Sequence, residues 1–201
     1  MLGIFLDTET NGLNPFIHKV LEIAFTLIDL STGEVKKEFS AVLSIPLQDW
    51  EKSDETSLKI NGFSWEEVQK GNSVSQVIQD IEQLFLQYNL KRGSAIFICQ
   101  NPSFDRPFFS QLVSPATQEK NLYPYHWLDL ASMFWAQSLI KYKAKQGPAP
   151  WEIGSSKDQI ARFYEIPPEK KPHRAQNGVA HLIQCYQAIV GFPNPLMQVQ
   201  S

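Results

Sequence analysis

Two carboxylates near the amino terminus, Asp7 and Glu9, have the spacing that most directly suggests chemistry. They follow a short apolar run at residues 4–6, which predicts a buried strand, and a turn is expected at residues 11–12. Residues two apart on a strand point to the same face, so the two carboxylates would lie side by side. Two anions held that close favour a divalent cation between them. The alternative is a pair of solvated acids at a strand end.

A third carboxylate and a histidine lie near the predicted starts of two helices. Asp105 follows the apolar run at residues 95–99, which is typical of a strand buried on both faces. Near a helix start, Asp105 could also be an ordinary helix cap. His173 follows Pro172 and precedes the last predicted helix, and by itself it could be a surface residue in a turn.

The elements that must position these residues alternate along the chain. Early strands followed by interleaved helices and strands predict an α/β architecture with a mixed sheet, in which a site forms at strand ends and helix starts. The first three strands, joined by short connections, predict an antiparallel meander. Apolar residues three and four apart predict the amphipathic helix that follows. After the first strand, the expected elements are strands at 18–30, 34–43 and 95–99, short helices within 45–71, helices at 74–85 and 157–164, a strand running into a helix at 125–134, and a last helix after Pro172.

The composition limits the class of protein. With 201 residues, 43% hydrophobic and 19% charged, the sequence predicts a soluble single domain at residues 1–190 and a flexible tail at 191–201. A net charge of −3 argues against a protein that coats nucleic acid nonspecifically, but a nuclease needs only local basic clusters. Cys99 and Cys185 lie in apolar segments and are expected to be buried thiols. Neither a membrane-length apolar run nor a signal-like start is seen, so a cytoplasmic location without membrane contact is expected.

Four separated segments resemble, in the right order, the motifs of the DEDD 3′–5′ exonucleases, the family of the DNA polymerase III epsilon subunit and RNase T. The string Asp-Thr-Glu-Thr-Asn-Gly-Leu at 7–13 resembles the first motif, Asn-Pro-Ser-Phe-Asp at 101–105 the second, and His-Arg-Ala at 173–175 the third motif of the His-containing branch. The string Leu-Lys-Ile-Asn-Gly-Phe at 58–63 resembles an auxiliary segment, with Asn61 where a His is common. The resemblance extends to about residue 190 and implies an RNase-H-like (DnaQ-like) mixed sheet flanked by helices.

The resemblance also implies a metal-dependent hydrolysis. Asp7, Glu9 and Asp105 would hold two Mg²⁺ or Mn²⁺ ions, because all-oxygen ligands suit these cations and paired ions suit phosphodiester hydrolysis. Asp7 would be the shared ligand, with Glu9 on the ion at the nucleophile side and Asp105 serving the second ion through water. His173 would take the proton from the attacking water, for which an ordinary imidazole pKa of about 6.5 is suitable.

The same resemblance suggests how a strand end would be recognised. Thr8, Thr10 and Asn11 are expected near the terminal 3′-hydroxyl, and a terminal base could stack on apolar side chains. For those apolar residues, ordinary core packing is the alternative, at least as strongly for Phe108. Lys170, Lys171 and Arg174 could contact phosphates. The predicted substrate-binding residues are Thr8, Thr10, Asn11, Leu13, Asn61, Asn101, Phe104, Phe108 and Arg174.

One position departs from the family pattern. The third motif should carry an Asp five residues after His173, but the sequence has Gly178, which leaves the carboxylate position vacant. The site would lose one ligand and one negative charge, and the neighbouring Asn177 would point about 100° away on a regular helix. A glycine inside a helix costs about 1 kcal/mol relative to Ala, so no structural benefit is expected from it. If the site is otherwise intact, Gly178→Asp is expected to raise activity.

The sequence therefore predicts a metal-dependent 3′–5′ exonuclease for single-stranded DNA or RNA, with activity weakened by Gly178. Besides a weakened enzyme, the glycine is compatible with a decayed exonuclease kept for binding or with an engineered or sequence-level change. The main alternative function is accordingly a catalytically inactive module that binds nucleic-acid ends or a polymerase partner. A nuclease for short oligonucleotides is a third hypothesis. The partners to be considered are single-stranded 3′ ends, a DNA polymerase and a second copy of the chain.

Overall fold

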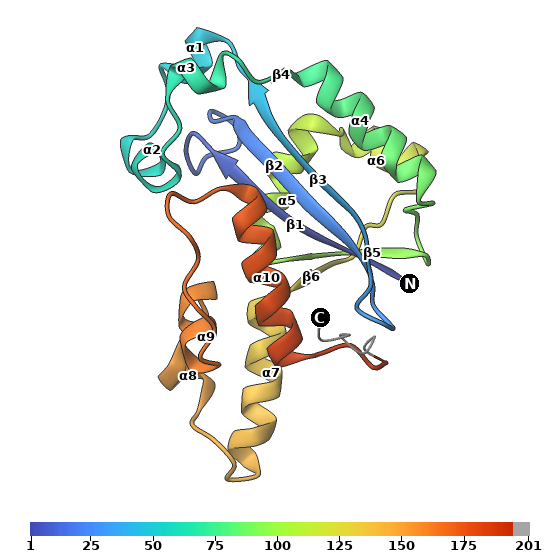
Figure 1. Ribbon diagram of the computed structural model, residues 1–201, viewed down its shortest axis with the longest axis vertical. Helices are drawn as coiled ribbons and strands as arrows, with labels where there is room; N and C mark the ends of the chain where they lie inside the picture. Colours follow the sequence, from blue (N-terminus) through green and yellow to red (C-terminus); the bar gives the residue numbers. More distant parts are fainter. Residues whose placement is uncertain (195–201) are drawn as a thin grey trace, which may run out of the picture.

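Six strands form one mixed sheet in the order β4-β3-β2-β1-β5-β6 (Figure 1). The computed structural model describes residues 1–194. The strands are β1 (Leu2–Thr10), β2 (Val20–Asp29), β3 (Val35–Ser44), β4 (Asn72–Ser73), β5 (Ala95–Cys99) and β6 (Trp127–Asp129). β1 to β3 pair antiparallel, whereas β1 with β5 and β5 with β6 pair parallel. The structure confirms the predicted mixed sheet and its initial meander.

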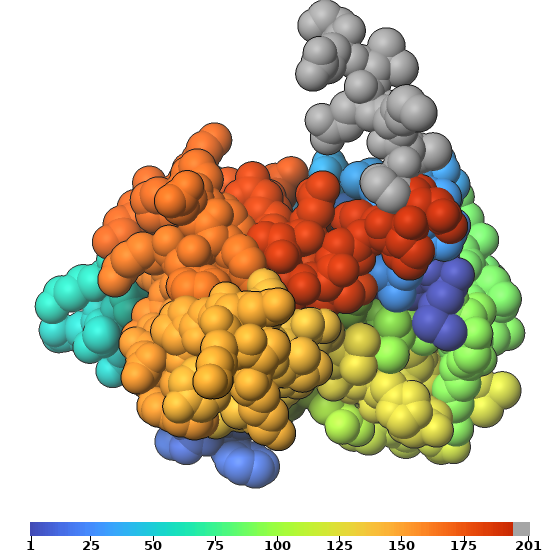
Figure 2. Space-filling model, turned by 90° about the horizontal axis from the view of Figure 1, so that it is seen from below, coloured from blue at the N-terminus to red at the C-terminus, as the bar shows by residue number. Residues whose placement is uncertain are grey.

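The helices cover both faces of this sheet. They are α1 (Leu47–Trp50), α2 (Glu55–Asn61), α3 (Trp65–Val68), α4 (Val74–Gln87), α5 (Pro102–Leu112), α6 (Pro115–Lys120), α7 (Leu130–Lys143), α8 (Pro150–Ile153), α9 (Lys157–Phe163) and α10 (Ala175–Ile189). In Figure 1, α10 crosses in front of β1 and β2, and α4 and α5 lie on the other side. Figure 2 shows the segments from α7 to α10, orange to red, as a continuous surface on one side of the molecule.

Alternation along β1 divides the buried side chains between two apolar cores. Ile4 and Leu6 pack with residues of α4 and α5, whereas Phe5 packs with residues of α7, α9 and α10. The same period of two places Asp7 on the α10 face, where its carboxylate lies against Gly178. The first strand thus directs its carboxylates toward the start of α10.

Some expected elements are placed differently. The second strand begins at Val20 rather than at residue 18, and the short β4, α6 and α8 were not predicted because so few residues carry little periodic signal. Helix α5 begins at Pro102, after Asn101 in the left-handed conformation, so Asp105 lies inside the helix and is not its cap. Proline suits this first position because its missing N–H would be unpaired there anyway.

The chain continues past α10 along the edge of the domain. Phe192 packs near Tyr186, with ring centroids 5.6 Å apart, and the Asn194 N–H donates to the Ser31 carbonyl at 2.8 Å. Residues 191–194, the first part of the expected tail, therefore contact the domain, and 195–201 lie outside the described residues. Cys99 and Cys185 are buried and unbonded, as predicted. Within residues 1–194, every helix is too short or too polar to cross a membrane.

Candidate active site

The first carboxylate, Asp7, lies against the backbone of α10 at Gly178. A Cβ added at position 178 would lie only 2.2 Å from Asp7 Oδ2, far inside van der Waals contact. Glycine is therefore the residue that leaves room for the Asp7 carboxylate in this arrangement. The expectation that Gly178 brings no structural benefit was based on helix propensity alone and did not include this packing of β1 against α10.

Asp105 is held directly behind the end of β1. Its side chain is buried, and its Oδ1 accepts hydrogen bonds from the Thr8 N–H at 3.1 Å and the Thr8 hydroxyl at 2.8 Å. These bonds connect α5 to β1 and fix the carboxylate relative to its neighbours on the strand. Asp7, Glu9 and Asp105 are called here the N-terminal half of the site. Their support is a central strand and a long helix.

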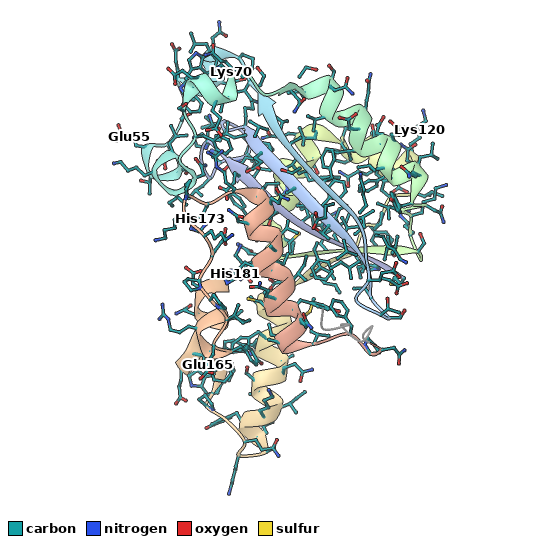
Figure 3. The ribbon with its side chains drawn as sticks, viewed as in Figure 1. Glu55, Lys70, Lys120, Glu165, His173 and His181 are labelled. Carbon is teal, nitrogen blue, oxygen red and sulfur yellow. The ribbon has the colours of Figure 1, made fainter. Side chains whose placement is uncertain are left out.

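His173 approaches from the segment that joins α9 to α10 (Figure 3). Its backbone N–H donates to the Ile60 carbonyl at 3.1 Å, which anchors the segment to α2. Its Nδ1 lies 3.3 Å from Glu169 Oε1. All four predicted catalytic residues line one open hollow of about 280 Å³, together with Thr8 and Phe104. The fold therefore brings together side chains that are 166 positions apart in sequence, from Asp7 to His173 (173 − 7).

Three charged residues that line the hollow were not predicted: Asp158, and the two that make the contacts described next, Lys157 and Glu169. Lys157 Nζ lies 2.7 Å from Glu169 Oε2, 3.8 Å from Asp7 Oδ1 and 3.4 Å from the Gly178 carbonyl. Both residues occur in polar stretches of sequence, where charged side chains are usually solvated, so no local pattern marked them. Lys157, Glu169 and His173 are called here the C-terminal half of the site.

Glu22 is a further buried carboxylate that the sequence analysis did not consider. It lies opposite Glu9 in the β1–β2 pair, and its Oε2 accepts a hydrogen bond from the Ala175 N–H at 2.8 Å. A carboxylate is favourable at the first turn of a helix, where N–H groups lack partners. A Glu inside the apolar run of β2 was the signal that could have identified it. Glu22 thereby fixes the start of α10, next to His173.

The carboxylates of the N-terminal half are crowded and poorly solvated. Burial raises the pKa of Asp7 to about 6, in spite of the nearby Lys157 ammonium. Burial and then the charge of Asp7 raise the pKa of Glu9 to about 8, and the same two causes raise the pKa of Asp105. A bound cation would favour the ionised carboxylates and reverse these shifts. The N-terminal half thus has the electrostatic character of a cation site.

In the C-terminal half of the site, contacts between opposite charges outweigh the effect of burial on the pKa values. Burial raises the pKa of Glu169, but contact with His181 and the Lys157 ammonium outweighs it and lowers the pKa to about 2. For Lys157, burial lowers the pKa, but Asp7 and Glu169 raise it further, so its net shift is upward. Glu169 and Lys157 are therefore a charged pair at neutral pH.

The donor atoms suit a hard divalent cation. One ligand atom from each of Glu9, Glu169 and His173 lies within 4.8 Å of the others. With Asp7 and Asp105 in the same hollow, oxygen donors dominate, which favours Mg²⁺ or Mn²⁺ over zinc. The residues present therefore fit the ions that the sequence analysis expected.

Several predicted substrate-binding residues instead hold the end of β1 in place. The Thr10 hydroxyl donates to the Gly12 carbonyl at 2.8 Å. Asn11 is fully buried and donates to the Asp49 carbonyl at 2.8 Å. Asn61, also buried, donates to the Thr10 carbonyl at 2.9 Å. These side chains are occupied in positioning β1, and the expectation that they contact substrate is not supported by their placement.

The apolar candidates separate clearly. Phe104 lines the hollow and remains available for stacking. Phe108 is completely buried in the core beneath α5, so the stacking interpretation was wrong and the core-packing alternative was right. Leu13 is 74% exposed and is absent from the lining of the hollow. The start of a helix beside a site exposes only one face of that helix to the site. Phe108 lies on the inner face of α5, so it packs in the core.

The polar candidates of the second and third motifs have local partners. Arg174 pairs with Glu67 at 2.7 Å and lies 3.9 Å above the Phe63 ring, so it ties the start of α10 to α3. Asn101 precedes α5 in the left-handed conformation, which Asn adopts more readily than most residues, and it accepts a hydrogen bond from Ser103. Neither side chain lines the hollow.

Comparison with known proteins agrees with this geometry. The model of the RNase T family, described as "Exonuclease", matches residues 4–177 and so spans most of the chain. The chain belongs to this exonuclease family. The chain is also 21% identical over 208 residues to Ribonuclease T of Marinobacter nauticus, a match that covers 98% of the chain and 89% of that relative.

Solved structures show the same fold. Cell-death related nuclease 4 (CRN-4) is similar with a TM-score of 0.71 at 14% identity, over 96% of this chain and 66% of that chain. The nuclease domain of 3′hExo, a DEDDh family member bound to rAMP, is similar with a TM-score of 0.63 at 13% identity. The match covers 95% of this chain and 94% of that domain. The RNase-H-like fold predicted from the motifs is thereby confirmed. The chain spans only about two-thirds of the nuclease 4 chain.

Proposed function

We propose that this chain is a metal-dependent enzyme that hydrolyses the phosphodiester bond at the 3′ end of single-stranded DNA or RNA. The observation that carries the proposal is the convergence of Asp7, Glu9, Asp105 and His173 on one hollow at the end of β1. Asp7 and Glu9 come from the first family motif and lie on the same face of one strand. Asp105 and His173 come from the second and third motifs. Such a convergence is expected of a catalytic site and not of solvated surface acids.

The residues of the chain then have distinct tasks. When bound, the divalent ions lower the pKa of the attacking water and stabilise the leaving oxygen. Asp7, Glu9 and Asp105 would hold these ions, and Thr8 keeps Asp105 in position through its two hydrogen bonds. His173 accepts the proton of the attacking water, because its imidazole lines the same hollow and faces Glu169.

Substrate recognition would be limited and sequence-tolerant. Phe104 offers an aromatic surface at the hollow, on which a terminal base could stack with about 1–3 kcal/mol. The hollow is open to solvent, so a strand end could enter it. Among the similar solved structures, E. coli ExoI is in complex with single-stranded DNA, and a 3′-exonuclease shows 3′-end specific recognition of a histone mRNA stem-loop.

A second candidate function is a catalytically inactive module that binds nucleic-acid ends or a polymerase partner. The observation in its favour is the Lys157 ammonium, which lies 3.8 Å from Asp7 beside the position where the family has its fourth carboxylate. An ammonium there supplies positive charge that a metal ion would otherwise supply. This candidate predicts that strands bind without being shortened and that binding needs no divalent ion.

The deciding experiment uses single strands of DNA and RNA labelled at the 3′ or the 5′ end. The purified chain is incubated with each strand in Mg²⁺, in Mn²⁺ and in chelator, with Asp7→Ala as the control variant. We expect early release of a 3′ label, gradual shortening of the 5′-labelled strand, dependence on the divalent ion and loss of activity in the control. The sugar preference follows from the same gels.

Intact strands in every metal condition, with binding retained in chelator, would replace this proposal by the binding module. Internal cuts that appear before terminal release would contradict exonuclease polarity. Shortening that persists in chelator and in Asp7→Ala would show that the activity comes from elsewhere.

A further inference from the structure

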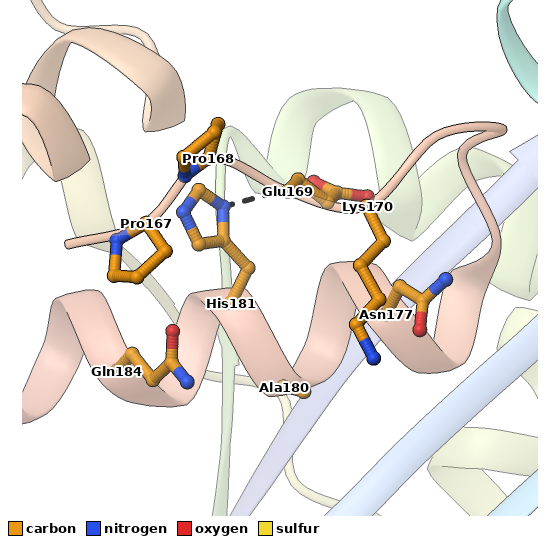
Figure 4. A pocket seen from close by; sticks show the side chains of 8 residues that line it. All are labelled: Pro167, Pro168, Glu169, Lys170, Asn177, Ala180, His181 and Gln184. Carbon is orange, nitrogen blue, oxygen red and sulfur yellow. Dashed lines mark ion pairs between the residues drawn. The ribbon is translucent and has the colours of Figure 1, made fainter.

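Glu169 is the most deeply buried charged group of the C-terminal half of the site. Its side chain is only 2% exposed. It lies between the site hollow and a second hollow on the outer side, bounded by α10 and the prolines that precede it (Figure 4). Burial of a carboxylate is unfavourable unless it is paired, and the partners are Lys157 at 2.7 Å, His173 at 3.3 Å and His181 at 3.7 Å. A carboxylate in this position requires an explanation beyond surface solvation.

The pairing of Glu169 leaves much of its bonding capacity unused. Neither carboxylate oxygen receives a well-aligned hydrogen bond from the described residues, and neither ring nitrogen of His181 makes one. An ionised carboxylate has about four acceptor sites, and the contact with Lys157 satisfies only one of them electrostatically. The remaining lone pairs are beside the hollow that Asp7 and Glu9 line. A buried acceptor directed at a hollow of other acceptors points to a cation as the missing partner.

The distances place Glu169 within reach of a shared ion. One ligand atom each from Glu9, Glu169 and His173 lies within 4.8 Å of the others, although Glu9 comes from β1 and the other two come from the segment before α10. The side of the hollow where α10 would normally offer a carboxylate carries only the backbone of Gly178, with Lys157 Nζ 3.4 Å from its carbonyl oxygen. Glu169 therefore approaches the site from the segment before α10, beside Lys157, and not from α10 itself.

We infer that Glu169 replaces the carboxylate missing at Gly178 and binds a divalent cation together with Glu9, with Lys157 as its counter-charge in the metal-free protein. This inference rests on the proposed function, which requires a divalent ion in the same hollow. It restores the number of carboxylates to four: Asp7, Glu9, Asp105 and Glu169. The residue that closes the set is supplied from a position nine residues before Gly178 (178 − 169).

The role of Lys157 follows from its position between Asp7 and Glu169. An ammonium in contact with both carboxylates competes with a divalent cation for them. Removing the charge by Lys157→Met should therefore strengthen binding of the metal, whereas removing a ligand by Glu169→Gln should weaken it. Glu169→Gln in the native background is not decisive, because the variant also frees the ammonium to repel the ion.

The test is a comparison of Lys157→Met with Lys157→Met/Glu169→Gln. MnCl₂ alone is titrated into the full-length, metal-free protein, and binding is followed by calorimetry and by the spin resonance of free Mn²⁺. We expect the double variant to bind Mn²⁺ about 10- to 100-fold more weakly than Lys157→Met, the range found when groups that support a metal site are removed. Thermal unfolding in chelator checks that both variants are folded.

A matched control is Glu165→Gln, a substitution of the same kind at an exposed position of the same segment (Figure 3). It should leave Mn²⁺ affinity unchanged. Equal Mn²⁺ affinity in Lys157→Met and the double variant would overturn the inference, since Glu169 would then be only the counter-ion of Lys157. That result would leave the proposed function intact if the native chain still shortened strands with Mn²⁺. Native protein that binds Mn²⁺ through Glu169 yet leaves every strand intact would instead refute the proposed function alone.

Discussion

The two halves of the site are built in different ways. The N-terminal half lies on the central strand β1 and inside α5, and its side chains are fixed by packing and by the hydrogen bonds between Thr8 and Asp105. The C-terminal half lies at the start of α9 and in the segment before α10, and it is held by ion pairs. The first half belongs to the first two family motifs, whereas in the second half only His173 belongs to a motif and the expected carboxylate of that motif is replaced by Gly178. Lys157 and Glu169, at the start of α9 and in the connecting segment, lie outside these motifs.

The comparison teaches that Gly178, the position of the missing carboxylate, is part of a connected set of contacts at the site. Gly178 leaves room for Asp7, Lys157 contacts both Asp7 and Glu169, and Glu169 in turn faces His173. A change at any of these positions should therefore affect the others, because residues that share partners are energetically coupled. The following predictions test whether the two halves divide the work as this arrangement suggests.

The largest effect is expected for His173→Gln. If His173 acts as the general base, strand shortening should slow by about 10²- to 10⁴-fold, the usual contribution of a positioned acid or base. Binding of Mn²⁺ should change little, since the carboxylates remain. Rates are measured on a 5′-labelled single strand at saturating Mn²⁺, with the calorimetric titration in parallel. Loss of Mn²⁺ affinity as large as the loss of rate would make His173 a metal ligand and would break the division between the halves.

A smaller effect is expected for substitutions at Gly178. Gly178→Ala places a Cβ against Asp7 Oδ2 and should push this carboxylate out of position, which would slow hydrolysis by about 10- to 100-fold. Gly178→Asp adds the same Cβ and a carboxylate that Glu169 already supplies, so we now expect it to lower activity as well. Gly147→Ala, where the nearest side-chain atom to the added Cβ is 3.9 Å away, is the matched control. A gain of activity in Gly178→Asp above the native rate would show that the vacant position itself limits the enzyme.

The smallest effect concerns the stability of the metal-free protein. Folding raises the pKa of Asp7 from 3.8 to about 6 and that of Glu9 from 4.5 to about 8. At pH values between the unfolded and the folded pKa, the folded state binds more protons than the unfolded state. The free energy of unfolding should therefore fall as pH rises from about 4 to 8. The lowered pKa of Glu169 acts in the opposite direction only below about pH 4.5, where its stabilising charge is lost.

This pH dependence is measured by thermal unfolding in chelator. We expect the melting temperature to decrease by about 2–4 °C from pH 5 to pH 8, the shift that 1 kcal/mol produces in a chain of this size. Glu9→Gln should flatten the profile, because it removes the larger shift, and Mn²⁺ should reverse the decrease. A profile that stays flat in the native, metal-free chain would show that the carboxylates of the N-terminal half are better compensated than their burial suggests.

Much of the N-terminal half could be predicted because it depends on local rules. The period of two along a strand places Asp7 and Glu9 on one face, and the continuous apolar run of Ala95–Cys99 identifies a strand buried on both faces. The order of strands and helices then determines a mixed sheet whose strand ends meet the starts of α5 and α10. These features need only the sequence, since period and composition fix which side of an element is buried.

The C-terminal half depended on the tertiary structure. Lys157 and Glu169 are ordinary charged residues in polar stretches, and their 2.7 Å ion pair exists only because α9 and the segment before α10 meet beside β1. From the sequence, Phe108 could either stack on a base or pack in the core. It is a core residue because it lies on the side of α5 that faces the core. Gly178 was a missing ligand in the sequence, and only the approach of α10 to Asp7 made it a contact surface. The sequence thus determined which elements form and which faces they bury, and packing between distant elements decided which charges meet, because electrostatic contacts depend on distances that local sequence does not contain.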